Sequence, residues 1–222
     1  GDSAPNTPAG TEAAERKKCR DAWAAWWKLN AKRIDLGRLK ERRRYGYTLI
    51  CENFNNRVYE TDRHGKERWV IENLNNPLDA VVLPGNRVLI AECHANRVSE
   101  RDFKGNILWQ KKIAQPVSVQ RLPNGNTFIA TYCGPISEVD RAGKEIYVIA
   151  NVPQNIISAY RSRKGSIVCL TLKGECVLID TTGKRLKSFA ISRDPNTVGS
   201  VASSPNDRLL VTQDGSNKVV EY

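Results

Sequence analysis

The chain has 222 residues, of which 40% are apolar and 27% are charged, a composition typical of a globular protein. No apolar run approaches the roughly 18 residues that a transmembrane helix requires, so that class of protein is excluded. The formal net charge is +11, which favours acidic partners over basic ones.

The N-terminal fifth of the chain differs in character from the remainder. Residues 1–10 are small, polar and rich in proline, which predicts a disordered leader. The pattern that follows predicts a helix over 11–33, with Thr11 as its cap, and a second short helix that ends at Arg44. Residues 11–44 are therefore expected to form a basic, tryptophan-rich helical extension.

Three tryptophans define one face of the longer helix. Trp23, Trp26 and Trp27 occupy positions i, i+3 and i+4, which places them on one apolar stripe. Because exposing three indole rings is costly, we expect the stripe to dock onto the rest of the chain or onto an upstream helical domain. A helix that binds a partner protein or a membrane surface is the alternative.

The positive charge is concentrated in this extension. Residues 1–44 hold 12 basic and 6 acidic residues, so they carry a net charge of +6. The second helix ends in three basic residues, Arg42, Arg43 and Arg44. These groups either bind phosphate or complement the dipole of their own helix. The whole extension is either a solvated basic surface or a contact with an acidic protein, polysaccharide, lipid or nucleic acid.

A repeat fills the rest of the chain. Four Asp-x-x-Gly turns recur at spacings of 40, 38 and 40 residues, with their aspartates at Asp62, Asp102, Asp140 and Asp180. The Asp side chain can accept hydrogen bonds from downstream backbone N–H groups and Gly supplies a positive φ, so each turn closes a hairpin. Each period contains four short runs with strand chemistry, separated by turn residues. Four strands per roughly 40 residues is typical of a β-propeller blade.

The predicted fold class is therefore all-β, a propeller of about five four-stranded blades over residues 45–222. The first blade, 46–71, lacks its inner strand, and the last, 197–222, lacks its outer one. Either the chain closes as a five-bladed ring or it belongs to a six-bladed ring completed by a partner chain. An aromatic side chain follows three of the turns, at Trp69, Trp109 and Tyr147. Because this position recurs with the fold, we expect these rings to pack between neighbouring blades.

The units DRHGKERW, DFKGNILW and RLPNGNTFIAT resemble the repeats of PQQ-like and NHL-like β-propellers, and those of arylsulfotransferase-like proteins. The resemblance covers about residues 46–222. It implies a propeller but no particular activity, because such repeats occur in enzymes, assembly factors and sensors alike. Residues 15–44 resemble the helical segment that follows HEAT-type repeats in large bacterial proteins. Together these resemblances imply the cell envelope or exterior of a bacterium.

Ligand sites of propellers usually lie over the central channel, on the face shared by the loops between second and third strands and the loops between blades. Four acidic residues fall in those loops and are the candidates for a ligand there, Glu52, Asp79, Glu92 and Asp214. No cofactor is expected, because no phosphate-binding loop, catalytic triad order or HExxH motif occurs in the sequence.

One combination in the same loops resembles a chemical site. Cys93 and Cys133 occupy the same repeat position in adjacent blades, and His94 follows the first of them. The two cysteines are unrelated thiols, a disulfide, or ligands that hold a soft metal together with His94. All three interpretations remain open at this stage.

The functional hypothesis is a non-catalytic binding or scaffold module that engages a protein partner within a larger assembly. It rests on a regular repeat without a convergent catalytic set, joined to a tryptophan-rich basic helix. The alternatives are an enzyme or ligand-binding propeller around Cys93 and His94, and attachment to an acidic polymer through residues 16–44. Nucleic acid is disfavoured, because the helix lacks the aromatic and basic interleaving of single-strand binders.

Overall fold

The computed structural model describes most of the propeller and one helix. The described residues are Pro5 and residues 12–31, 46–162, 164–191, 199–203, 209–213 and 218–221. The chain divides into two compact units, Gly1–Tyr45 and Gly46–Tyr222. Several predicted features lie outside the described residues, namely the second helix, Arg42, Arg43, Arg44, Asp214 and almost all of the leader.

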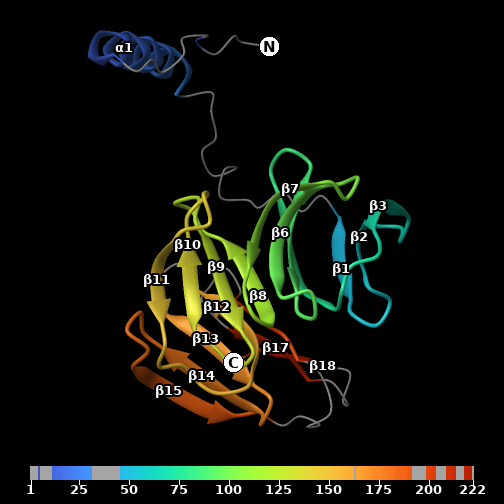
Figure 1. The fold of residues 1–222 in the computed structure, drawn as a ribbon. Coiled ribbons are helices and arrows are strands. Elements are labelled where there is room, and N and C mark those ends of the chain that lie inside the picture. The colour runs from blue at the N-terminus through green and yellow to red at the C-terminus, as the bar shows by residue number, and fades with distance from the viewer. Residues whose placement is uncertain are drawn as a thin grey trace. The chain divides into compact units, whose positions relative to one another are not determined.

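The N-terminal unit contains helix α1 (Ala13–Asn30; Figure 1). Its N-cap is Glu12, whose backbone N–H donates to the Glu15 carboxylate at 3.4 Å, so the predicted start at residue 11 was wrong. The carboxylate three positions into the helix selects Glu12, because it can satisfy the N–H of that residue. At the other end the Asn30 amide donates to the carbonyl of Trp26 at 2.8 Å. Within the described ranges, no helix combines the length and apolarity that a membrane span requires.

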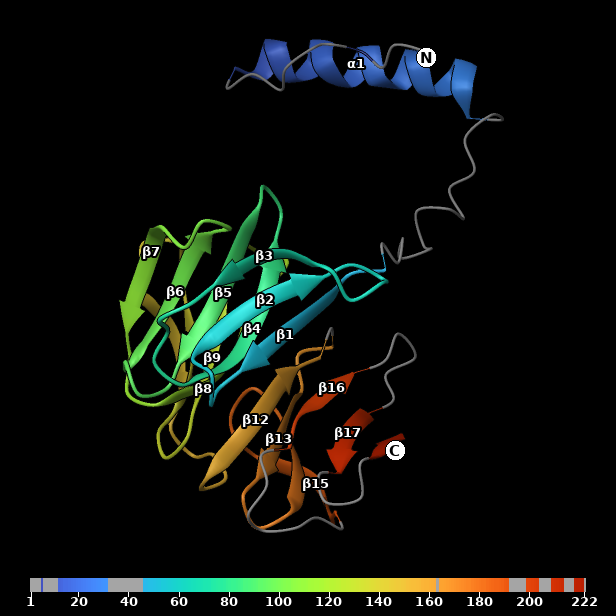
Figure 2. The ribbon, with the colours of Figure 1, turned by 90° about the vertical axis from the view of Figure 1, so that its right-hand side faces the viewer.

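The second unit is a five-bladed β-propeller (Figures 1 and 2). Three blades have four antiparallel strands, ordered from inner to outer along the chain. The second blade contains β4 (Pro77–Leu83), β5 (Arg87–Glu92), β6 (Arg97–Asp102) and β7 (Ile107–Lys112). The third contains β8 (Pro116–Arg121), β9 (Thr127–Thr131), β10 (Ile136–Val139) and β11 (Glu145–Ile149). The fourth contains β12 (Ile156–Arg161), β13 (Ile167–Thr171), β14 (Glu175–Ile179) and β15 (Arg185–Ala190).

The first and fifth blades have three described strands each. The first contains β1 (Thr48–Glu52), β2 (Arg57–Thr61) and β3 (Glu67–Ile71), and the fifth contains β16 (Val201–Ser203), β17 (Leu209–Gln213) and β18 (Lys218–Glu221). By repeat position, the first blade lacks the inner strand and the fifth the outer one, as the sequence predicted. Strands β4, β8, β12 and β16 lie side by side in that order, and β1 contacts β4. Among the described strands, none of the first blade contacts the fifth.

The Asp-x-x-Gly turns form as the sequence predicted. Each aspartate accepts hydrogen bonds from two downstream backbone N–H groups, at 2.8–3.0 Å. These bonds lower the pKa of Asp62 below its usual value. Gly183 shows why the glycine is needed: its φ is +85°, and a Cβ there would lie 2.4 Å from the carbonyl oxygen of Asn151.

The hydrophobic core lies mainly between blades. Trp69 of the first blade is buried and stacks on Phe103 of the second, with ring centroids 4.4 Å apart. Trp109 is half-buried against the apolar cluster between the second and third blades, and Tyr147 against the cluster between the third and fourth. The prediction that these aromatic rings pack between neighbouring blades is therefore confirmed.

Hydrogen bonds between inner strands join consecutive blades. In each case a side chain near the start of one inner strand accepts the backbone N–H of a residue in the next. The three pairs are Asp79 and Val119 (2.8 Å), Ser118 and Ala159 (2.9 Å), and Ser158 and Val201 (3.1 Å). We call these the inner-strand latches. They recur at the blade period, so they belong to the repeat.

Candidate functional site

The loops of the predicted ligand face are fixed by two asparagines. Asn56 and Asn96 have positive φ values of 52° and 51°, which turn the chain sharply after β1 and β5. Their side-chain oxygens accept backbone N–H groups of the connection to the next blade, from Asn76 and Gln115, at 2.9 Å each. This explains the repeated Asn-x-Val marker, and it holds the loops in one arrangement.

Glu92, at the end of β5, is completely buried and fully engaged. Its carboxylate accepts hydrogen bonds from Arg97 at 2.8 and 2.9 Å and from Arg101 at 2.7 Å. The hydroxyl of Ser99 donates a further bond at 3.2 Å. Burial by itself raises the pKa of Glu92, but the hydrogen bonds and charges of the two arginines outweigh it and lower the pKa. Glu92 is thus an ionised group held inside the second blade.

Glu52 is the counterpart of Glu92 in the first blade. It accepts hydrogen bonds from Arg57 at 2.6 Å, from Asn55 at 2.9 Å and from the hydroxyl of Tyr59 at 2.9 Å. The bond from Arg57 is the main reason that the pKa of Glu52 falls to about 2. The recurrence of one acid–arginine arrangement in two blades indicates a role in shaping the loop.

Asp79 lies on β4, where it forms the first inner-strand latch. Desolvation raises the pKa of its carboxyl group to about 7, against the lowering effect of the hydrogen bond from Val119. Ser118 and Ser158 make the same latch without a charge. The acid at this position is therefore exceptional in the repeat, and it titrates close to neutral pH.

The structure does not bring Cys93, His94 and Cys133 together. Cys93 is buried, which raises the pKa of its thiol, whereas Cys133 is exposed and donates to the Asn155 side chain at 3.4 Å. His94 is exposed and shares a hydrogen bond of 2.9 Å with the Asn76 amide. All six cysteines are free thiols. In the described parts of the chain, no three His, Cys, Asp or Glu side chains gather as a metal site.

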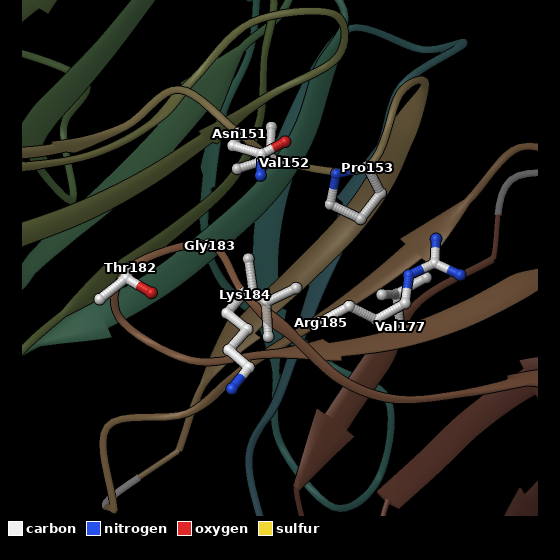
Figure 3. A pocket seen from close by; sticks show the side chains of 9 residues that line it. Asn151, Val152, Pro153, Val177, Thr182, Gly183, Lys184 and Arg185 are labelled. Atoms are coloured by element: carbon white, nitrogen blue, oxygen red, sulfur yellow. The ribbon is translucent and has the colours of Figure 1, made fainter.

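A cavity of about 530 Å³ lies between the connection 151–153 and the outer half of the fourth blade (Figure 3). Lys184 and Arg185 line it, but Figure 3 shows their cationic ends pointing in opposite directions. Arg185 also donates to Glu175 at 2.8 Å. The two cations therefore do not converge on one ligand.

Sequence reasoning missed a second set of charged groups. A buried glutamate lies on the third strand of three blades, at Glu60, Glu100 and Glu138, and each binds at least one arginine. The signal was present, because each glutamate stands two residues before the turn aspartate, in YETD, SERD and SEVD. What surrounds each of them depends on the next blade, which the local pattern does not reveal.

No protein-family model matches the sequence, and no curated protein matches it. Among solved structures, the chain is similar to a protein of unknown function from Bacteroides caccae, with 19% identity and a TM-score of 0.60, covering 78% of this chain and 71% of that one. Virginiamycin B lyase from Staphylococcus aureus gives 15% identity, a TM-score of 0.57, and coverage of 79% of this chain and 66% of that one. The WD40 β-propeller domain of Doa1 gives 14%, 0.62, 78% and 59% for the same quantities.

The chain thus spans roughly two thirds of the length of these structures. At such identities the likeness concerns the fold, and their activities are statements about those proteins alone. Both the repeat and the comparisons lead to one assignment: the chain is a β-propeller repeat protein.

Proposed function

We propose that the chain is a non-catalytic propeller module that engages a protein partner through the tryptophan face of α1. The observation that carries this proposal is the exposure of that face. Helix α1 has no buried residue, and Trp23 and Trp27 expose 43% and 40% of their surface. Trp26 packs edge-to-face on Trp23, with ring centroids 5.6 Å apart, so the rings form one apolar surface. Tryptophan is the residue most enriched among the anchors of protein interfaces.

The loop face supports a binding module over an enzyme. The carboxylates of Glu52, Asp79 and Glu92 all accept hydrogen bonds from the protein itself. An acid that holds a loop or a neighbouring blade is poorly placed to exchange protons with a substrate. The propeller then serves as a rigid platform, and the helix supplies the adhesive surface.

The test is affinity capture from extract of the native source with two matched variants of the full chain. One variant replaces Trp23, Trp26 and Trp27 with alanine, and the other replaces three basic residues of the same helix with alanine. The latter are Lys17, Lys18 and Arg20. Alanine is the best helix former, so neither variant should unfold α1.

We expect a discrete protein partner that the basic variant retains and the tryptophan variant loses. Capture should survive ~0.5 M salt, at which charges more than a few ångströms apart are screened. Loss with the basic variant or with salt alone would contradict the proposal and favour attachment to an acidic polymer. Unchanged capture by the tryptophan variant would also contradict it, and would direct attention to the loop face around Cys93 and His94.

A further inference from the structure

A second cavity, of about 510 Å³, lies between the second and third blades. It opens on the side of the β4–β5, β8–β9 and β10–β11 turns, away from the loops that carry Glu52 and Glu92. Its polar and aromatic lining comes from five residues, Arg87, Glu100, Trp109, Arg121 and Arg141. Three of the five are arginines, contributed by β5, β8 and the β10–β11 turn.

One carboxylate serves two of these arginines. The Arg87 guanidinium donates to one oxygen of Glu100 at 2.5 Å, and the Arg121 guanidinium donates to the other at 2.5 Å. Glu100 is buried, so its charge is committed to this pair. Two guanidinium groups around one carboxylate leave an excess of one positive charge.

Arg141 adds a third guanidinium to the cluster. It lies against Gly125, where a Cβ would stand 3.2 Å from two of its nitrogens, and Arg121 donates to the Gly125 carbonyl at 2.9 Å. Arg141 makes no ion pair or hydrogen bond with any residue in the described ranges. Desolvation, together with the charges of Arg141 and Arg87, lowers the pKa of Arg121 against the opposing effect of Glu100. The cavity therefore carries an excess of two positive charges.

The neighbouring interfaces show that the fold does not need these charges. Between the first and second blades, Glu60 pairs with Arg68, while Val82 and Phe103 occupy the repeat positions of Arg121 and Arg141. Between the third and fourth blades, Glu138 pairs with Arg161. There Asn126 and Thr181 occupy the positions of Arg87 and Arg141. One arginine is thus sufficient to bury the glutamate, and the second and third blades hold two more.

Several donors of the cluster point to an absent anion. The Nη2 atom of Arg87, the Nε atom of Arg121 and the whole guanidinium of Arg141 donate to no described residue. Guanidinium groups match the oxygens of phosphate in geometry and charge. Trp109 supplies an apolar wall, because its ring lies within 3.8 Å of the Cβ position of Gly143 in the Arg141 turn. A volume near 500 Å³ is within the usual range for organic ligands and exceeds what one phosphate fills.

We propose that the cavity between the second and third blades binds the phosphate group of a small organic phosphate monoester. The dianion neutralises the excess of two charges, Arg87, Arg121 and Arg141 donate to its oxygens, and the organic part lies along Trp109. This site is independent of the tryptophan face of α1, so the two proposals stand or fall separately.

Isothermal titration calorimetry with phenyl phosphate tests the site in the full chain at physiological salt. The variant is Arg141→Ala, and the matched control is Arg63→Ala, which removes the same charge from the equivalent position of the first blade. Both side chains are exposed, so neither change should disturb folding. We expect saturable binding of one ligand, weakened roughly tenfold or more by Arg141→Ala and unchanged by Arg63→Ala.

Two further probes define what is bound. Phenyl sulfate carries one negative charge, so it should bind more weakly than phenyl phosphate, and inorganic phosphate should bind more weakly because it cannot contact Trp109. Absence of saturable binding, or equal losses in the Arg141 and Arg63 variants, would overturn the proposal. Equal affinity for inorganic phosphate would overturn the assignment of an organic ligand.

Discussion

Two interfaces of this propeller are built from the same repeat and yet differ in chemistry. Between the first and second blades, Trp69 is buried and stacked on Phe103, and Glu60 has one arginine partner. Between the second and third blades, Trp109 is only half-buried and a cavity holds three arginines around Glu100. The repeat therefore conserves the aromatic ring and the buried acid, while the neighbouring positions decide whether the interface is closed or open.

The comparison separates what the fold needs from what it tolerates. A buried carboxylate needs at least one cationic partner, and every one of the three interfaces supplies it. The closed interface fills the remaining space with an aromatic ring. The open one leaves that space lined by guanidinium groups, at a cost in packing that a bound anion would offset. Four substitutions sharpen or break this contrast.

The largest effect is expected from the buried indole of the closed interface. Trp69→Ala should lower the free energy of unfolding by about 3–5 kcal/mol, because it leaves a cavity and unstacks Phe103. Trp109→Ala should cost roughly half as much, since its ring already faces the open cavity. Urea unfolding of both variants measures the difference. Equal costs would show that the two interfaces are equally packed.

The acids provide the second comparison. Glu100→Gln should destabilise the protein by about 2–3 kcal/mol, because it leaves Arg87 and Arg121 crowded without a counter-charge. Glu60→Gln should cost about 1 kcal/mol, since the Arg68 side chain is 36% exposed and can turn to water. Chemical denaturation at neutral pH measures both values. A larger loss for Glu60→Gln would refute the view that Glu100 neutralises a crowded cluster.

Asp79 makes the second–third interface sensitive to pH. The folded chain keeps its proton up to about pH 7, whereas an unfolded aspartate releases it near pH 3.8. The folded state therefore binds more protons across this window, and its stability falls as the pH rises from about 4 to 7.

Asp79→Ser should keep the latch, as Ser118 and Ser158 do, and should remove this dependence. Because Asp79 retains partial exposure, we expect a gain of about 1–2 kcal/mol at pH 8 and little change at pH 4. Thermal unfolding of the two proteins across this range measures the difference. Parallel curves for the two proteins would contradict the raised pKa.

The smallest effect on stability should come from Arg141→Phe, which gives the open interface the residue that the closed one has at that position. The ring should cover Trp109 and stabilise the protein by about 0.5–1 kcal/mol. The same change should abolish binding of phenyl phosphate. Retained binding in this variant would show that the phosphate does not use Arg141.

The fold could be predicted from the sequence because its signals are local. The Asp-x-x-Gly turns, their spacing and the strand patterns all lie within single hairpins, so blade order and the missing inner and outer strands were predicted correctly. The start of α1 was wrong by two residues, because Thr11 and Glu12 both resemble caps and only the reciprocal contact with Glu15 distinguishes them.

The candidate sites were less predictable, because they form across blades. Arg87, Arg121 and Arg141 stand 34 and 20 residues apart, and nothing in the local pattern of one blade shows what the next blade presents to it. Glu92 and Asp79 attracted attention as isolated acids, whereas their partners lie on neighbouring strands. A comparison of equivalent positions in all the repeats would have exposed the surplus arginines, since it asks which residue departs from the others.

The inner-strand latches have a consequence for how such a protein can change in length. Each latch joins a side chain of one blade to a backbone N–H of the next, and Val119, Ala159 and Val201 all serve as the donor. A backbone donor is the same whichever residue carries it, so the joint places almost no demand on the sequence that follows. A duplication or excision of one whole period would therefore recreate a working joint at its boundary. Blade number can change through gene rearrangement without new contacts having to evolve first.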